Sequence, residues 1–436
     1  MDILIKIAQL FLCFTILVGI HELGHFLMAR AFKIRVEKFY IFFDPWFSLF
    51  KFKRGDTEYG LGWLPLGGYV KIAGMIDESM DKEQMKQPVK PDEFRAKPAW
   101  QRLLVMVAGV MMNVLLAIVI YCAVCYTWGD SYFSNQDAKW GYNFNPTAHE
   151  MGFRDGDRFV SIDGEEIDNV MRVQNDLLIT DGGRRVVVER GGEPVTLDIP
   201  FESLLRMRQE KAYEDLFTLR LPFIVDSVSY TSAVEAGLQS GDEVVAIDDL
   251  RDADYPRYRD YLQKHKNDKV LLTVRRDGAL IDSLALPVDA EGRIGVTVTN
   301  PYSLRTQYYT FWESIPAGIH KAGKTISSYW DQLKLIVQPK TKMYEELGGF
   351  VAIGSIFPSS WDWHDFWLKT AFLSIILAVM NLLPIPGLDG GHALFTLWEI
   401  ITRRKPSEKF LEVAQYVGLM IILALLVYAC LLYTSP

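Results

Sequence analysis

The feature that most limits how this chain can fold is a set of four apolar stretches, each long enough to form a membrane-spanning helix. The hydrocarbon core of a bilayer is about 30 Å thick, and roughly 20 helical residues are needed to cross it. Between the stretches the composition is that of soluble protein, so the chain is predicted to combine membrane helices with water-exposed domains. The four stretches are residues 3–29, 103–127, 366–386 and 413–433.

The first stretch has an alternative interpretation, which is a cleaved signal peptide ending near residues 29–31. Its N-terminal end carries few basic residues, and it is longer than the apolar region of an ordinary signal peptide. We therefore expect it to be retained. The prediction is a polytopic α-helical membrane protein with four transmembrane helices.

Basic residues beside the stretches predict the orientation, because the cytoplasmic ends of membrane spans collect Lys and Arg. They follow the first stretch and precede the second and the fourth. The loops at 30–102 and 402–410 are therefore expected in the cytoplasm, and the segment 128–365 on the opposite side. The basic residues are Arg30, Lys33, Arg35, Lys38, Arg95, Lys97, Arg102, Arg403, Arg404 and Lys405.

The segment 128–365 is acidic, with 26 Lys plus Arg against 38 Asp plus Glu, a net charge of −12. An acidic surface argues against nucleic acid as a partner. All four cysteines fall inside or beside apolar stretches, so a disulfide framework in this segment is excluded.

The same segment contains an internal repeat. The sequence TAHEMGFRDGDRFVSIDG at 147–164 returns as SAVEAGLQSGDEVVAIDD at 232–249, displaced by 85 residues. Each copy predicts a short helix, a turn and an alternating strand, and hence two α+β domains in tandem. The pattern resembles PDZ domains, over 130–212 and 213–300, which implies extracytoplasmic domains able to bind extended peptides at a sheet edge. The alternative is a pair that only screens the membrane portion sterically.

Two histidines and a glutamate interrupt the first apolar stretch, in the sequence GIHELGHF at 19–26. His21 and His25 are four residues apart, so on a helix both imidazoles project from one face and can reach one zinc ion. Glu22 points about 100° round the helix, which suits a base acting on water better than a metal ligand. The alternative is a hydrogen-bond network between membrane helices.

A third zinc ligand is expected from another stretch at the same membrane depth. The sequence NLLPIPGLDGGHALF at 381–395 places Asp389 among prolines and glycines that break a helix. The third stretch runs in the same direction as the first, so Asp389 also lies toward the cytoplasmic side. His392 is a competing candidate, which we expect to be structural or to support the ligands.

The H-E-x-x-H motif, together with N-x-x-P-x-P-x-x-D-G near the third stretch, resembles the site-2 protease family of intramembrane zinc metalloproteases. The resemblance covers nearly the whole chain. It implies a Zn²⁺ cofactor held by His21, His25 and Asp389, with Glu22 as the catalytic base and Asn381 as a group that holds the substrate strand. It further implies a multi-pass protein of the cell inner membrane, with periplasmic PDZ-like domains and the active site near the cytoplasmic side. Its expected partners are membrane lipid and single-span membrane proteins cut within or near their transmembrane segments, such as an anti-sigma factor or a signal-peptide remnant.

The segment 57–75, TEYGLGWLPLGGYVKIAGM, alternates apolar and polar residues and is expected to form a β-hairpin that dips into the membrane. In the family such an edge accepts the unwound substrate as an added strand, which implies substrate binding by Gly67, Gly68, Tyr69 and Val70. A plain cytoplasmic hairpin is the alternative. The sequence AGVMMN at 108–113 also fits the family's G-x-x-x-N motif in the second stretch.

The predicted organisation divides the chain into five parts. The first holds the first two transmembrane helices and the hairpin, the next two are PDZ-like domains, the fourth is an amphipathic connector, and the fifth holds the last two transmembrane helices. One rival is a membrane-anchored PDZ adaptor without catalysis, and another is a metalloprotease that acts outside the bilayer. The five parts are residues 1–129, 130–212, 213–300, 301–360 and 361–436.

Overall fold

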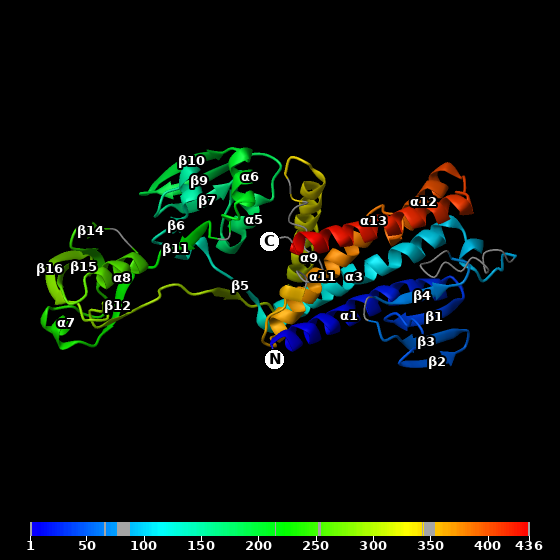
Figure 1. The fold of residues 1–436 in the computed structure, drawn as a ribbon, viewed down its shortest axis with the longest axis horizontal. Helices are drawn as coiled ribbons and strands as arrows, with labels where there is room; N and C mark the ends of the chain where they lie inside the picture. Colours follow the sequence, from blue (N-terminus) through cyan, green and yellow to red (C-terminus); the bar gives the residue numbers. More distant parts are fainter. Residues whose placement is uncertain are drawn as a thin grey trace. The chain divides into compact units, whose positions relative to one another are not determined.

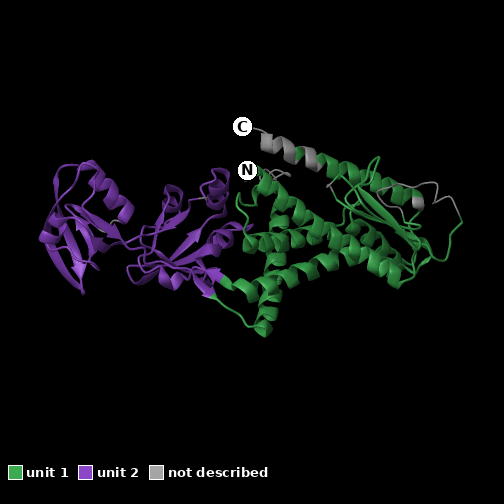
Figure 2. Cartoon of the chain, turned by 90° about the horizontal axis from the view of Figure 1, so that it is seen from below, with its two compact units in different colours: residues 1–130, 307–436 green, residues 131–306 purple. Residues whose placement is uncertain are grey.

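The computed structural model describes residues 2–64, 67–75, 88–213, 215–251, 254–341, 343 and 354–434. The described residues fall into two compact units (Figure 2). Unit 1 is Met1–Asp130 with Gln307–Pro436, and unit 2 is Ser131–Thr306. Each unit is described separately below.

Unit 1 is built mainly from helices, with α3 packed against α1, α9, α11 and α12 (Figure 1). Side chains of α3, α9 and α11 form a shared apolar core that includes Ile120, Ala322 and Ile375. The helices are α1 (Asp2–Ala31), α3 (Ala99–Trp128), α9 (Phe311–Val337), α11 (Trp363–Leu382), α12 (Asp389–Thr402) and α13 (Glu408–Thr434).

Within the described residues, three helices are long and apolar enough to cross a membrane: Ile3–Ala31, Ala99–Trp128 and Trp363–Leu382. They match the first three predicted spans, and the chain is a membrane protein. The fourth predicted span, 413–433, falls in α13 and lies partly outside the residues whose side chains are described, so it stays a prediction.

The third span ends earlier than predicted. The apolar stretch continues to residue 386, but α11 stops at Leu382 and Leu383 is extended, with φ −60° and ψ 142°. Proline disfavours helical geometry in the residue before it and has no N–H to continue the helix, and Pro384 and Pro386 both follow. The chain turns helical again at Asp389.

A four-stranded sheet belongs to unit 1 within the described residues. Its order is β2-β3-β1-β4, so β2 and β4 are the edge strands. β1 pairs in parallel with β3 and antiparallel with β4, and β2 with β3 forms an antiparallel pair. The strands are β1 (Val36–Ile41), β2 (Phe50–Arg54), β3 (Thr57–Leu61) and β4 (Tyr69–Ile72).

The predicted hairpin over 57–75 is therefore wrong, because β3 and β4 do not pair with each other. β1 lies between them and buries Val36 and Tyr40 completely. An alternating pattern indicates strands but not which strands are neighbours. The central strand was not predicted, because the basic residues at 30–38 indicated only the flank of a membrane span.

In unit 2, the two repeated segments fold alike. Helices α4 and α7, strands β7 and β13, and strands β9 and β15 each start 85 residues apart. In the first copy the sheet order is β10-β9-β7-β8, and in the second it is β16-β15-β13-β12-β17, with β14 also paired to β13. The matched elements are α4 (Pro146–Glu150) and α7 (Thr231–Glu235), β7 (Arg158–Ile162) and β13 (Glu243–Ile247), β8 (Glu165–Glu166) and β14 (Leu250–Arg251), α5 (Val173–Leu178) and α8 (Tyr255–Lys264), β9 (Arg184–Arg190) and β15 (Lys269–Arg276), and β10 (Glu193–Ile199) and β16 (Ala279–Pro287).

Further elements complete each copy. The strand pairs β6 with β11 and β5 with β18 form two-stranded sheets, and each copy has its own apolar core, one around Phe159 and the other around Phe223. The PDZ assignment and the boundaries 130–212 and 213–300 stay predictions. The remaining elements are β5 (Asp130–Tyr132), β6 (Tyr142–Phe144), α6 (Phe201–Gln209), β11 (Phe217–Leu219), β12 (Phe223–Val228), β17 (Val296–Val298) and β18 (Arg305–Gln307).

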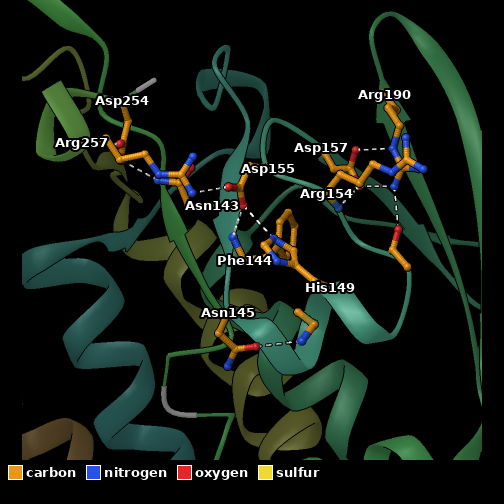
Figure 3. A network of polar contacts seen from close by, with 12 residues as sticks. Asn143, Phe144, Asn145, His149, Arg154, Asp155, Asp157, Arg190, Asp254 and Arg257 are labelled. Atoms are coloured by element: carbon orange, nitrogen blue, oxygen red, sulfur yellow. Dashed lines mark hydrogen bonds and ion pairs between the residues drawn. The ribbon is translucent and has the colours of Figure 1, made fainter. Parts of the chain in front are cut away.

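Equivalent ion pairs brace the two copies. Arg190 donates two hydrogen bonds to the buried carboxylate of Asp157, both 2.7 Å long, and a third to the Gly152 carbonyl (Figure 3). In the second copy Arg276 makes the same contacts with Asp242 and with the carbonyl of Gly237. Because Asp157 and Asp242 are almost fully buried, these pairs hold β9 and β15 to the turns that precede β7 and β13.

Polar contacts also join the two copies to each other. Arg257 of α8 donates to Asp155 at 2.8 Å, and Asn143 of β6 donates to Asp254 at 2.6 Å (Figure 3). Asp155 also accepts from the Phe144 amide. Burial would raise the pKa of Asp155, but these hydrogen bonds and the Arg257 charge hold it below its usual value.

Candidate metal centre

The paired histidines of α1 lie on the face of that helix that packs against α3. Both are 7% exposed, and their ring centroids are 4.8 Å apart. The Nδ1 atom of His25 is 2.8 Å from the carbonyl oxygen of Val105 on α3. His25 therefore donates Nδ1–H to that carbonyl and leaves Nε2 without a proton in the neutral ring.

Asp389 reaches the histidines because α12 begins at this residue, after the proline-containing break. The two glycines that follow allow the tight return of the chain. A Cβ at Gly390 would lie 2.3 Å from the Leu383 carbonyl oxygen, and one at Gly391 would lie 2.5 Å from that of Ile385. Farther along α12, an ion pair between Arg102 of α3 and Glu399, 2.6 Å long, connects these two helices.

The three predicted ligands meet at one point. The Oδ2 atom of Asp389 is 3.0 Å from His21 Nε2 and 3.2 Å from His25 Nε2, and the two Nε2 atoms are 3.2 Å apart. Donors bound to one tetrahedral zinc ion at 2.0 to 2.1 Å would be about 3.3 Å from one another. The observed spacing is close to that value.

The surroundings of these atoms suit a cation. Asp389 Oδ2 is buried and has no hydrogen-bond partner among the described residues. The unprotonated Nε2 of His25 also points at it, so two electron-rich atoms face each other, which is unfavourable unless a cation lies between them. A Cβ at Gly109 of α3 would be 2.4 Å from His25 Nε2, so the absence of a side chain there keeps the space open. Two imidazoles and a carboxylate are a zinc donor set that leaves a fourth position free.

Glu22 lies beside this group and next to the sheet. The backbone amide of Val70 on β4 lies close to its carboxylate. The amide of Val70 therefore points away from β1, and the free edge of β4 faces Glu22. Gly68 permits this approach, since a Cβ there would lie 2.8 Å from the Val18 side chain and 3.5 Å from Glu22.

A cavity of about 990 Å³ opens onto the group within unit 1. Apolar side chains of α1 and α11 line much of it, together with Met106 of α3, and the edge strand β4 forms part of its wall. Every predicted site residue lines it: His21, Glu22, His25, Gly67, Gly68, Tyr69, Val70, Asn381 and Asp389.

Two other polar residues named from the sequence lie close to this group. Asn381, predicted to hold substrate, has its Nδ2 atom 3.5 Å from His21 Nε2, so it lies within reach of the ligand group as well as the cavity. His392 lines the cavity but is not part of the three-donor group.

Two groups at the candidate site were not predicted from the sequence. The Val105 carbonyl is a backbone group and leaves no trace in the sequence. Gln415 of α13 lines the cavity, is 7% exposed, and its Oε1 has no hydrogen-bond partner among the described residues. A glutamine inside an apolar stretch was the one available indication for it.

A histidine pair and a carboxylate that converge inside a bundle of apolar helices, with a glutamate and a strand edge alongside, define the class of membrane-embedded zinc peptidases. The chain belongs to peptidase family M50, the site-2 protease family, whose family model matches residues 9–425. This confirms the predicted resemblance, and the protein is an intramembrane zinc metalloprotease with zinc as its cofactor.

Individual relatives cover nearly the whole chain. It is 28% identical over 419 residues to a protein of Clostridium perfringens named as a candidate zinc metalloprotease, covering 95% of this chain and 94% of the relative. A Vibrio cholerae protein named in the same way is 29% identical over 455 residues, with 98% of each chain covered. The regulator of sigma E protease of Haemophilus influenzae is 27% identical over 453 residues, again with 98% of each chain covered. The order of the motifs, with two repeated domains between the second and third spans, also predicts a likeness to that last relative, and this likeness is confirmed.

Proposed function

We propose that His21, His25 and Asp389 hold the catalytic zinc ion and that Glu22 is the general base of peptide hydrolysis. The observation that carries this proposal is the convergence of three buried donor atoms from α1 and α12, 3.0 to 3.2 Å apart, on the wall of a cavity. The adaptor alternative would be favoured by a missing ligand or base, and all four residues are present.

A zinc ion held by His21, His25 and Asp389 would supply a Lewis acid for the scissile carbonyl and would lower the pKa of a bound water molecule. Glu22 takes the proton from the attacking water on its carboxylate and then gives it to the leaving amine. The Val70 amide orients that carboxylate before substrate enters. The apolar side chains that line the cavity exclude most bulk water from the reacting groups.

The substrate binds as an extended strand along the free edge of β4. A helix hides its peptide bonds in its own hydrogen bonds, so a transmembrane substrate must unwind before it can be cut. Gly67, Gly68, Tyr69 and Val70 offer an edge whose backbone groups can replace those bonds. The edge is held in place by the Tyr69 hydroxyl, which donates to Asp44 at 2.9 Å, and by stacking of Tyr69 on Tyr40. Asn381 steadies the same strand near the metal.

The proposed substrates are single-span membrane proteins cut within or near their transmembrane segments. One relative is named for regulation of sigma E, which makes an anti-sigma factor one candidate and a signal-peptide remnant another. We place the protein in the cell inner membrane with four spans, with unit 2 periplasmic and the metal site near the cytoplasmic face. The two PDZ-like domains take peptide ligands or exclude substrates with a bulky outer domain.

The proposal is tested with a Glu22→Gln variant of the full chain on a single-span model substrate. Glutamine keeps the size of the side chain but cannot take a proton, so cleavage should fall by at least about 10²-fold, with zinc content unchanged. Normal turnover by this variant would end the assignment of Glu22. Cysteine labelling at Lys33 and at Ser240 checks the orientation, with Lys33 expected to react from the cytoplasm and Ser240 from outside.

A further inference from the structure

Asn113 is fully buried on α3 and lies beside the Nδ1 edge of the His21 ring. Its Nδ2 atom is 3.3 Å from His21 Nδ1. Its backbone oxygen accepts a hydrogen bond from Ser374 of α11 at 2.8 Å, which fixes the position of the residue between the two helices. Its Oδ1 atom is buried with no hydrogen-bond partner among the described residues.

The protonation of His21 decides what this contact can be. If Nδ1 accepted a hydrogen bond from the amide NH₂ group, the proton of the neutral ring would sit on Nε2 and point at Asp389 Oδ2, 3.0 Å away. His21 could not then bind a metal through Nε2. In His25 the Val105 carbonyl already imposes the opposite arrangement, with the proton on Nδ1.

The two ends of an amide have nearly the same shape, and the hydrogen-bond network decides which end faces which neighbour. Turning the Asn113 amide by 180° brings Oδ1 to the His21 Nδ1 atom. The unpartnered oxygen then gains a donor, and His21 presents an unprotonated Nε2 to the same point as His25.

We propose that Asn113 is a positioning residue whose side-chain oxygen accepts the Nδ1–H of His21 and thereby sets the tautomer and the orientation of this zinc ligand. The inference rests on the proposed metal site. Asn113 does for His21 what the Val105 carbonyl does for His25, so α3 holds both rings from behind although it supplies no ligand itself. Groups that orient a ligating histidine in this way change metal affinity by about 10- to 100-fold when removed.

Two variants separate this role from ordinary packing. Asn113→Leu keeps the branching at Cγ on a larger side chain and accepts no hydrogen bond, whereas Asn113→Asp has nearly the same size, accepts a hydrogen bond and has no NH₂ group. If the amide only filled space or donated to a neighbour, the aspartate would be as harmful as the leucine. Gln9→Leu is the matched control. Gln9 is fully buried on α1, about three turns before His21, and its Nε2 atom donates a hydrogen bond to the Pro358 carbonyl.

The experiment measures the zinc dissociation constant of the full chain in detergent, by competition with a chelator, and the absorption bands of the cobalt-substituted protein. We expect Asn113→Leu to weaken zinc binding by about 10- to 100-fold and to alter the cobalt spectrum, while Asn113→Asp and Gln9→Leu bind as the wild type does or, for the aspartate, more tightly. Wild-type affinity in Asn113→Leu, or equal losses in the leucine and aspartate variants, would overturn the inference. Failure of the wild-type chain to bind zinc would instead overturn the proposed metal site.

A second measurement needs no variant. The ¹⁵N resonances of His21 in the zinc-loaded wild-type protein report which ring nitrogen carries the proton. The proposal predicts a proton on Nδ1, as for His25. A zinc-loaded His21 with its proton on Nε2 would contradict the proposal.

Discussion

At position 109, an added methyl group would occupy space beside the proposed metal site. Gly109 packs against both ring ligands, and an added Cβ would lie 2.4 Å from His25 Nε2 and 2.7 Å from His21 Cε1. Neither ring can move away from such a Cβ easily, since His25 is hydrogen-bonded to Val105 and His21 lies beside Asn113.

We therefore expect Gly109→Ala to weaken zinc binding by at least about 10-fold, since ligand geometry is lost, although alanine favours a helix more than glycine does. The control is Gly323→Ala on α9, where a Cβ would meet nothing within 4 Å. Zinc affinity by chelator competition checks both variants. Equal affinity in the two would show that the Gly109 position is not tight around the metal.

The residues proposed to carry the chemistry could be singled out in the sequence because their spacing and their setting are unusual. His21, Glu22 and His25 follow a helical spacing inside an apolar stretch, and Asp389 follows a proline-containing break in another. The groups that orient them were less accessible. A backbone carbonyl such as that of Val105 has no sequence pattern, and the orientation of the Asn113 amide depends on a contact between helices far apart in the chain.

At the scale of elements, the sequence indicated strands near the metal but not their pairing. The alternation over 57–75 was correct for β3 and β4, yet the central strand β1 came from a segment interpreted as a basic flank. Similarly, α11 ends four residues before the end of its apolar stretch, because the prolines that follow disfavour helical geometry even where the sequence is hydrophobic. The repeat in unit 2 was easier, since the same turn sequence occurs twice.

The edge strand β4 gives a prediction that concerns the backbone alone. Val70→Pro removes the amide that faces Glu22 and the substrate edge, whereas Val70→Ala keeps that amide and loses only side-chain contacts. We expect the proline variant to lose cleavage of a single-span substrate by at least about 10-fold, as expected for the loss of one or two hydrogen bonds to a charged or reacting group. The alanine variant should keep most of its activity. Zinc content should stay normal in both, and a fully active proline variant would exclude strand addition at this edge.

The buried ion pair of the first repeat gives a prediction about stability. Arg190→Met leaves the Asp157 carboxylate, 1% exposed, without its charged partner. Breaking a buried pair in this way costs about 3 kcal/mol, and we expect that loss in the opening free energy of the β7 and β9 amides, measured by hydrogen exchange. Arg185→Met on the same strand removes a pair whose side chains are 69% and 72% exposed, and it should change nothing measurable. Equal effects of the two substitutions would contradict the role given to the buried pair.

At the scale of the whole molecule, chemistry and selection are assigned to different units. The metal group, Glu22 and the cavity all lie in unit 1, and unit 2 begins and ends at paired strands, β5 and β18. Because these strands lie side by side, unit 2 can be replaced by a short linker without stretching the chain.

Replacement of residues 131–306 by such a linker tests the proposed filter. The shortened protein should bind zinc normally and should cut a single-span substrate whose outer domain has not been removed, which the complete protein should leave intact. Cleavage of trimmed and untrimmed substrates is compared by gel analysis for both proteins. If the shortened protein still spares the untrimmed substrate, unit 2 does not select by size.

The most direct test of the central claim is the zinc content of the purified full chain beside its Asp389→Ala variant, measured by elemental analysis after removal of loosely bound metal. In the proposed site two helices supply the ligands, so removal of the one from α12 leaves only the two histidines. The account predicts about one zinc ion per chain in the wild type and a large loss in the variant. A wild-type protein without zinc, or a variant that keeps its full complement, would contradict it.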